Sequence, residues 1–180
     1  MRIAVILGST RPGRRSEAVA QWVVNVANAR DDASFDLVDL AEFDLPMLDE
    51  PMPAIVGQYQ HAHTREWASR IASYDGFVFV TPEYNHSFSA ALKNAIDYLY
   101  AEWNDKAAGF VGIGGTGGLR AVEQLRLVLA ELKVATVRTQ VAFARGDLQG
   151  EPQHHDTLNV MLDELVAWAS ALRSVRSVAA

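Results

Sequence analysis

The sequence predicts an α/β fold built on an open, doubly wound parallel sheet of five strands. Two observations point to this fold. Short apolar segments recur along the chain, and most are continuous rather than alternating, which is typical of strands buried on both faces. Helical patterns of apolar residues separate these segments, as in parallel sheets covered by helices. With 180 residues, the chain is expected to form one domain over residues 1–180.

Each strand is expected where an apolar segment lies between polar or small residues, and each helix where apolar residues recur three or four positions apart. The expected strands cover residues 2–7, 34–40, 76–80, 107–113 and 134–137. The expected helices lie within residues 21–29, 58–74, 88–103, 122–132 and 158–172. Residues 44–57 contain three prolines and two methionines, so we expect an ordered loop without regular structure there, and residues 145–156 form a polar connection.

Composition excludes several classes of function. The formal charge is −6 and the pI is near 5.3, whereas nucleic-acid-binding surfaces concentrate lysine and arginine on one face, so no nucleic-acid partner is expected. The chain has no cysteine, which excludes disulfides and thiolate chemistry and leaves redox chemistry to a cofactor. No apolar run reaches the roughly 20 residues of a spanning helix, and no signal-peptide pattern is present, so we expect a cytoplasmic protein without a membrane partner.

Three loops are expected to carry the chemistry. In an open parallel sheet, ligands bind at the carboxyl ends of the strands, where the winding direction reverses. The loops that follow the first, third and fourth strands read GSTRPGRRS (residues 8–16), TPEYNHS (81–87) and GGTGG (114–118). The second of these contains a proline, a carboxylate, a phenol and an amide, which is more chemistry than a turn requires.

The first loop has the composition of a phosphate-binding turn. It leads into a helix, so its backbone N–H groups and the helix dipole favour an anion. Its hydroxyl and guanidinium donors are Ser9, Thr10, Ser16, Arg11 and Arg14. The loop matches neither the dinucleotide fingerprint, which needs a glycine at position 10, nor the P-loop, which needs a lysine near its end. The alternative is a polar turn capped by Ser16.

The second and third loops suit a planar ligand. Pro82 ends an apolar strand, and Glu83, Tyr84 and Asn85 then place a carboxylate, an aromatic ring and an amide at the rim of the crevice. The glycines of GGTGG permit positive φ and a close approach of backbone N–H groups to a ring. A flat heteroaromatic ring with donors and acceptors along one edge fits these surroundings, and the isoalloxazine of flavin is such a ring. By itself, the glycine loop fits a flexible turn equally well.

Together, three stretches resemble a known family. GSTRPGRRS, TPEYNHSFSAALKNAIDYL and GGTGGLRA, in this order, are similar to the NAD(P)H-dependent FMN reductases, a flavodoxin-like family that includes quinone, azo-dye and chromate reductases. The resemblance covers residues 2–172 and implies the strand order 2-1-3-4-5. It places the FMN phosphate on the first loop and the isoalloxazine between the other two. The residues predicted to bind the cofactor are Ser9, Thr10, Arg11, Arg14, Ser16, Pro82, Glu83, Tyr84, Asn85, Ser87, Gly114, Gly115, Thr116 and Gly117.

The function implied by this resemblance is that of an FMN-dependent NAD(P)H oxidoreductase. Flavin accepts hydride at N5 from NADPH or NADH and passes two electrons to a small acceptor, which can be a quinone, an azo compound, free flavin or a metal oxyanion. Because the cofactor carries the chemistry, no side chain is predicted to be catalytic. The family also implies a homodimer or a tetramer made of two dimers.

Two other functions are disfavoured but stay open. A flavodoxin-like FMN electron carrier usually holds its ring between aromatic faces and has a strongly acidic surface, whereas only Tyr84 is placed for stacking here and a charge of −6 is mild. A flavin-free interaction module conflicts with the chemical completeness of all three loops.

Some polar residues also have two interpretations. Asp39 ends the second strand, where it is either a ribose-binding acid or, as we favour, a solvated carboxylate. Arg120 either meets a nicotinamide cofactor's phosphate or faces solvent. Lys93 and Asp97 form either a subunit interface or a surface pair. No metal site is predicted, because no spaced third ligand accompanies the histidines of residues 154–155.

Overall fold

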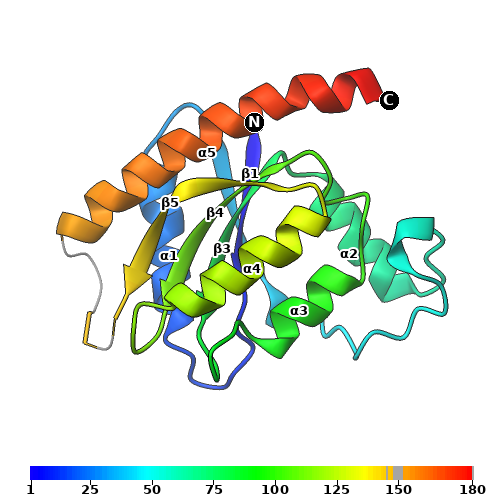
Figure 1. Ribbon diagram of the computed structural model, residues 1–180, viewed down its shortest axis with the longest axis horizontal. Coiled ribbons are helices and arrows are strands. Elements are labelled where there is room, and N and C mark those ends of the chain that lie inside the picture. Colours follow the sequence, from blue (N-terminus) through cyan, green and yellow to red (C-terminus); the bar gives the residue numbers. More distant parts are fainter. Residues whose placement is uncertain (145, 148–151, 180) are drawn as a thin grey trace.

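The computed structural model describes residues 1–144, 146–147 and 152–179. At its centre is a five-stranded parallel sheet (Figure 1). The spatial order is β2-β1-β3-β4-β5, which confirms the predicted order. Every neighbouring pair of strands is parallel. The strands are β1 (Arg2–Leu7), β2 (Ser34–Asp39), β3 (Gly76–Pro82), β4 (Ala107–Ile113) and β5 (Ala135–Phe143).

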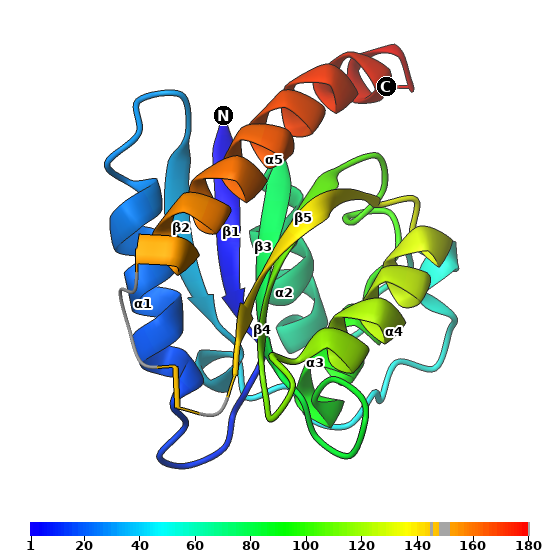
Figure 2. The same ribbon diagram turned by 60° about the vertical axis from the view of Figure 1, so that its left-hand side comes forward.

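Helices cover both faces of the sheet (Figures 1 and 2). The α-helices are α1 (Ser16–Ala27), α2 (Ala62–Ala72), α3 (Ala90–Asp97), α4 (Leu119–Glu131) and α5 (Pro152–Ala179). Two short 3-10 helices, Leu40–Glu42 and Ala54–Val56, lie between β2 and α2. Helices α1 and α5 pack on one face, and α2, α3 and α4 on the other, so two apolar cores flank the sheet. None of the helices in the described residues is both long and apolar enough to cross a membrane.

The second face is built around aromatic side chains whose polar atoms are satisfied. Trp67 of α2 is fully buried and donates to the Ala95 carbonyl over 2.8 Å. Trp103 is fully buried too, and it donates to the Ile96 carbonyl over 3.2 Å. Both carbonyls belong to α3. Because a buried indole N–H needs an acceptor, these bonds fix α3 to the core. They thereby also fix the end of the second loop, which leads into α3.

The last strand and helix are longer than the sequence pattern predicted. Strand β5 continues to Phe143, beyond the expected end at residue 137. It is an edge strand with one partly solvated face, so polar residues interrupt its apolar pattern. Thr139 donates from its N–H and its hydroxyl to Glu164 of α5, over 2.9 and 2.7 Å. Helix α5 begins at Pro152, within the predicted polar connection, of which residues 145 and 148–151 lie outside the described residues.

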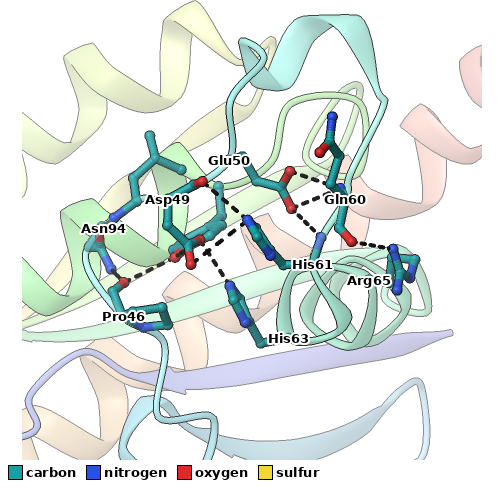
Figure 3. A network of polar contacts seen from close by, with 10 residues as sticks. Pro46, Asp49, Glu50, Gln60, His61, His63, Arg65 and Asn94 are labelled. Atoms are coloured by element: carbon teal, nitrogen blue, oxygen red, sulfur yellow. Dashed lines mark hydrogen bonds and ion pairs between the residues drawn. The ribbon is translucent and has the colours of Figure 1, made fainter.

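Polar contacts, together with the packing of Leu45 on the core, hold the loop of residues 44–57 against α3 and α2 (Figure 3). The side chain of Asn94 accepts a hydrogen bond from the Leu48 N–H (2.9 Å) and donates to the Pro46 carbonyl (2.6 Å). The carboxylate of Asp49 lies 3.0 Å from His63 Nε2 at the start of α2. The loop is therefore ordered without regular structure over most of its length, as expected, with a single 3-10 turn at Ala54–Val56.

A buried lysine lies at the amino edge of the sheet, opposite the predicted loops. Lys106 immediately precedes β4 and is 4% exposed. Its ammonium donates to the carbonyls of Ile71 (2.9 Å) and Ala72 (3.4 Å) at the C-terminal end of α2, where the helix dipole favours a cation. Burial, with a further contribution from the charge of Arg176, lowers the pKa of Lys106 to about 8.

Replacing Lys106 with methionine is expected to remove one component of the pH dependence of stability. Between pH 8 and 10.5 the unfolded chain keeps the lysine proton that the folded chain has lost, so this residue makes the free energy of unfolding rise with pH. The free energy of unfolding of the wild type minus that of Lys106→Met should therefore grow by about 1 kcal/mol per pH unit across that window. Urea unfolding of both proteins at several pH values measures this difference, and a constant difference would contradict the assignment.

Candidate functional site

The loops after β1, β3 and β4 meet at the carboxyl edge of the sheet and enclose two adjoining hollows. One has a volume of about 360 Å³ and lies over the first loop, residues 8–16. The other, of about 590 Å³, extends from that loop to the end of β5. Because the hollows share much of their lining, they form one cleft. The shared residues are Arg11, Arg15, Glu83, Tyr84, Ile113 and Gly114.

Two serines of the first loop are buried near the N-terminus of α1. Ser9 is fully buried, and its Oγ lies 3.0 Å from the Tyr84 hydroxyl. Ser16 is the first residue of α1, and its buried Oγ has no hydrogen-bond partner among the described residues. Arg15 occupies the N-cap position, so the alternative in which Ser16 caps the helix is wrong. An unpartnered buried hydroxyl is costly, and this one lies where a helix end favours an anion.

Arg14 is held by the protein itself. Its side chain is 12% exposed, donates to the Ser9 carbonyl over 2.6 Å and forms an ion pair with Asp39. Asp39 also accepts a hydrogen bond from the Ala41 N–H over 2.9 Å, and its side chain is 14% exposed. The favoured interpretation of Asp39 as a solvated carboxylate is therefore wrong, because it anchors the first loop to the end of β2.

Arg11 and Arg15 have the opposite character. Both side chains are exposed and line both hollows of the cleft. Within the part of the chain that the structure describes, neither forms an ion pair with a carboxylate. Sequence reasoning did not include Arg15, although its place directly before α1 was a signal for it. These two guanidinium groups are therefore available to a negatively charged ligand.

Thr10 points away from the other predicted residues of the first loop. It lines a separate hollow of about 310 Å³ together with Leu40, Asp44 and Asn94, among others. Thr10 is not among the residues that line the cleft. The backbone of the first loop thus separates two polar surfaces. The cleft is lined by the other predicted residues of this loop, Ser9, Arg11, Arg14 and Ser16, and by Arg15.

A tight turn gives the second loop, residues 81–87, a fixed shape. The backbones of Tyr84 and Ser87 exchange two hydrogen bonds, of 2.8 and 3.1 Å. Asn85 and His86 between them have φ values of 49° and 75°, which are those of a type I′ turn. Asparagine tolerates this left-handed region better than most side chains. The turn places the Tyr84 ring in the wall of the cleft.

In the glycine loop, residues 114–118, the glycines serve two different purposes. Gly117 and Gly118 have φ values of 70° and 68°, and a Cβ on Gly118 would lie 2.5 Å from the Ile113 nitrogen, so the turn itself requires glycine there. Gly114 and Gly115 line the cleft, and a Cβ on Gly115 would meet no atom within 4 Å. Of the predicted residues, Asn85, Ser87, Thr116 and Gly117, like Thr10, do not line the cleft.

Glu83 and Arg120 form an ion pair beneath the cleft wall. Burial alone would raise the pKa of Glu83, but the hydrogen bond and the charge of Arg120 hold it below its usual range. The carboxylate is therefore ionised near neutral pH. Arg120 is exposed at the start of α4, as one of its two interpretations states, and it is paired with Glu83.

The fold is that of a flavodoxin-like protein, and its cleft lies between the first loop and the ends of β3 and β4. The solved structure of FerB, a flavoenzyme NAD(P)H:(acceptor) oxidoreductase from Paracoccus denitrificans, has the same fold. The TM-score is 0.75 at 21% sequence identity, with 94% of this chain and 97% of FerB covered.

Sequence comparison identifies the family. The family model described as NADPH-dependent FMN reductase matches residues 1–147. An NAD(P)H-dependent FMN reductase of Schizosaccharomyces pombe is 43% identical over 144 residues, covering 79% of this chain and 72% of the relative. A quinone reductase of Escherichia coli K12 is 29% identical over 192 residues, covering 98% and 97%. The chain belongs to the NADPH-dependent FMN reductase family. This result confirms the predicted family and the predicted cofactors, FMN and NAD(P)H.

Proposed function

We propose that this oxidoreductase binds FMN in the cleft and transfers electrons from NAD(P)H to a small-molecule acceptor. The observation that carries the proposal lies at the N-terminus of α1. Among the described residues, the buried Ser16 hydroxyl there has no hydrogen-bond partner, and the guanidinium groups of Arg11 and Arg15 in the same hollow have no ion-pair partner. A phosphate monoester carries close to two negative charges at neutral pH and three acceptor oxygens. These donors match both the charge and the hydrogen-bonding capacity of that group.

The remaining cleft residues fit the flavin ring. Pro82 and Tyr84 line one wall, and Gly114 and Gly115 line another. Ile113, the last residue of β4, also lines the cleft. Glycine leaves backbone N–H groups open to a ring edge, where a Cβ would obstruct them. When bound there, FMN supplies the redox chemistry by accepting two electrons from NAD(P)H and giving them to the acceptor.

The side chains of the cleft bind and orient rather than react. Arg11 and Arg15 neutralise the phosphate, and the Ser9–Tyr84 hydrogen bond joins the phosphate end of the cleft to its ring end. No described side chain is assigned a proton transfer. The quinone reductase among the relatives supports a quinone as acceptor, and azo compounds, free flavin and metal oxyanions are the other acceptor classes that we propose for an open ring face.

A spectroscopic experiment tests this function. The purified protein is titrated with FMN, and NADPH or NADH is then added without oxygen while the visible flavin absorbance is followed. We expect FMN to bind and its absorbance to bleach rapidly, and a quinone added next should restore it. Binding without bleaching would favour an electron carrier instead, and no binding would overturn the flavin proposal.

Replacing Arg11 with alanine is expected to weaken FMN binding by about 1.5 to 3 kcal/mol, the scale of a lost charge-assisted contact. Riboflavin lacks the phosphate and should bind the variant as it binds the wild type. Fluorescence titration measures both affinities. Arg138 is exposed on β5 and does not line the cleft, so Arg138→Ala serves as the control and should change neither affinity. An equal loss for both flavins would remove Arg11 from the phosphate site.

We also propose a homodimer that uses the outer surface of α3 and the neighbouring loop. A groove of about 460 Å³ lies there, lined by Ile55, Ile96, Leu99 and Val128 among others. Ile55 is 66% exposed, and such apolar exposure is typical of an interface. Ile55→Asp is expected to shift the molecular mass in sedimentation equilibrium from dimer towards monomer. A monomeric wild-type chain would contradict the proposal.

A further inference from the structure

An ion pair joins two of the three loops that line the cleft, the second loop and the glycine loop. Glu83 follows β3 directly, and Arg120 is the second residue of α4, just after the glycine loop. The guanidinium of Arg120 pairs with the Glu83 carboxylate, and the Arg120 backbone N–H donates to Glu83 Oε2 over 3.2 Å. The Glu83 side chain is 4% exposed, whereas that of Arg120 is 45% exposed. The Glu83 carboxylate is thus enclosed, and the Arg120 side chain lies between it and the solvent.

Glu83 also contacts the residues on which the glycine loop begins. Its N–H donates to the Ile113 carbonyl over 2.8 Å. A Cβ on Gly114 would lie 3.0 Å from the Glu83 Cβ, so the loop packs directly on this residue. Glu83 therefore bonds to the residue before the glycine loop and to Arg120 after it. One side chain and its backbone fix both ends of the loop.

The position of the carboxylate makes the pair more than a surface contact. It lies at the N-terminus of α4, where the helix dipole favours a negative charge. An exposed ion pair contributes little, but removing one partner of an enclosed pair leaves an uncompensated charge in the wall. Loss of Arg120 would leave such a carboxylate beside Tyr84 and Gly114, in the lining of the cleft.

We propose that Glu83 and Arg120 are a positioning pair, which holds the second loop and the glycine loop at the separation that a flavin ring requires. The inference rests on the proposed function, because it assumes that the ring binds between these loops. Glu83 acts on the ring through the loop that it fixes, and Arg120 acts through Glu83. The pair therefore governs affinity for the ring, in contrast to Arg11, which governs affinity for the phosphate.

The test compares riboflavin and FMN binding to the apoprotein of Glu83→Gln, Arg120→Met and Arg120→Lys by fluorescence titration. Glu83→Gln and Arg120→Met should each weaken the binding of both flavins by the same factor, about tenfold. Arg120→Lys, which restores the charge, should recover most of the affinity. The double variant Glu83→Gln/Arg120→Met should bind no more weakly than Arg120→Met, because the two residues act through one interaction.

A matched control separates positioning from general stability. Arg2→Met breaks the ion pair of Arg2 with Asp36, whose N–O distance is 2.6 Å, at the amino edge of the sheet, and should leave both affinities unchanged. Urea unfolding of each apoprotein is measured alongside. Wild-type affinity in folded Glu83→Gln and Arg120→Met, or a loss confined to FMN, would overturn the positioning role. Failure of the wild-type chain to bind FMN would instead overturn the proposed function, and this inference with it.

Discussion

The geometry of the cleft depends on how closely the first loop approaches β3 and α3. The Gly8 N–H donates to the Val80 carbonyl over 2.9 Å, and the Gly8 carbonyl accepts a hydrogen bond from Ser89, whose hydroxyl also caps α3. A Cβ on Gly8 would lie 3.0 Å from Leu92 Cδ2 and 3.2 Å from the Val80 oxygen. Only glycine fits this crossing without displacement. This crossing sets the distance from the first loop to the second, because the second loop begins directly after Val80.

The charges around the cleft are arranged so that its acids are paired and its binding arginines are not. Asp39 pairs with Arg14, and Glu83 pairs with Arg120. Asp147, which lines the cleft, has Oδ2 3.6 Å from His154 Nε2. Arg11 and Arg15 have no such partner in the described residues. The chain as a whole carries a formal charge of −6, yet this surface offers uncompensated positive charge. A locally positive cleft on an acidic protein concentrates a small anion at one place and discourages binding of extended polyanions elsewhere.

The sequence was sufficient to predict the architecture and the location of the site, because both follow from local patterns. Buried parallel strands produce continuous apolar runs, and the topology then places the ends of β1, β3 and β4 together. The missed features all depend on contacts between distant segments. The pattern of β5 is interrupted by polar residues, one of which, Thr139, bonds to Glu164 of α5. The role of Glu83 depends on Arg120, which is distant in sequence and adjacent only in the fold.

The assignment of the arginines shows the limit of sequence reasoning at single-residue resolution. Arg14 and Arg15 are chemically identical and adjacent, but consecutive residues entering a helix point about 100° apart. Their side chains therefore diverge, and although both line the cleft, only the Arg14 side chain reaches Asp39. Asp39, at the end of β2, forms an ion pair with Arg14, which also donates to the Ser9 carbonyl. Among the described residues, Arg15 has no such partner. A carboxylate on a neighbouring strand thus determines which guanidinium group is free to meet the ligand.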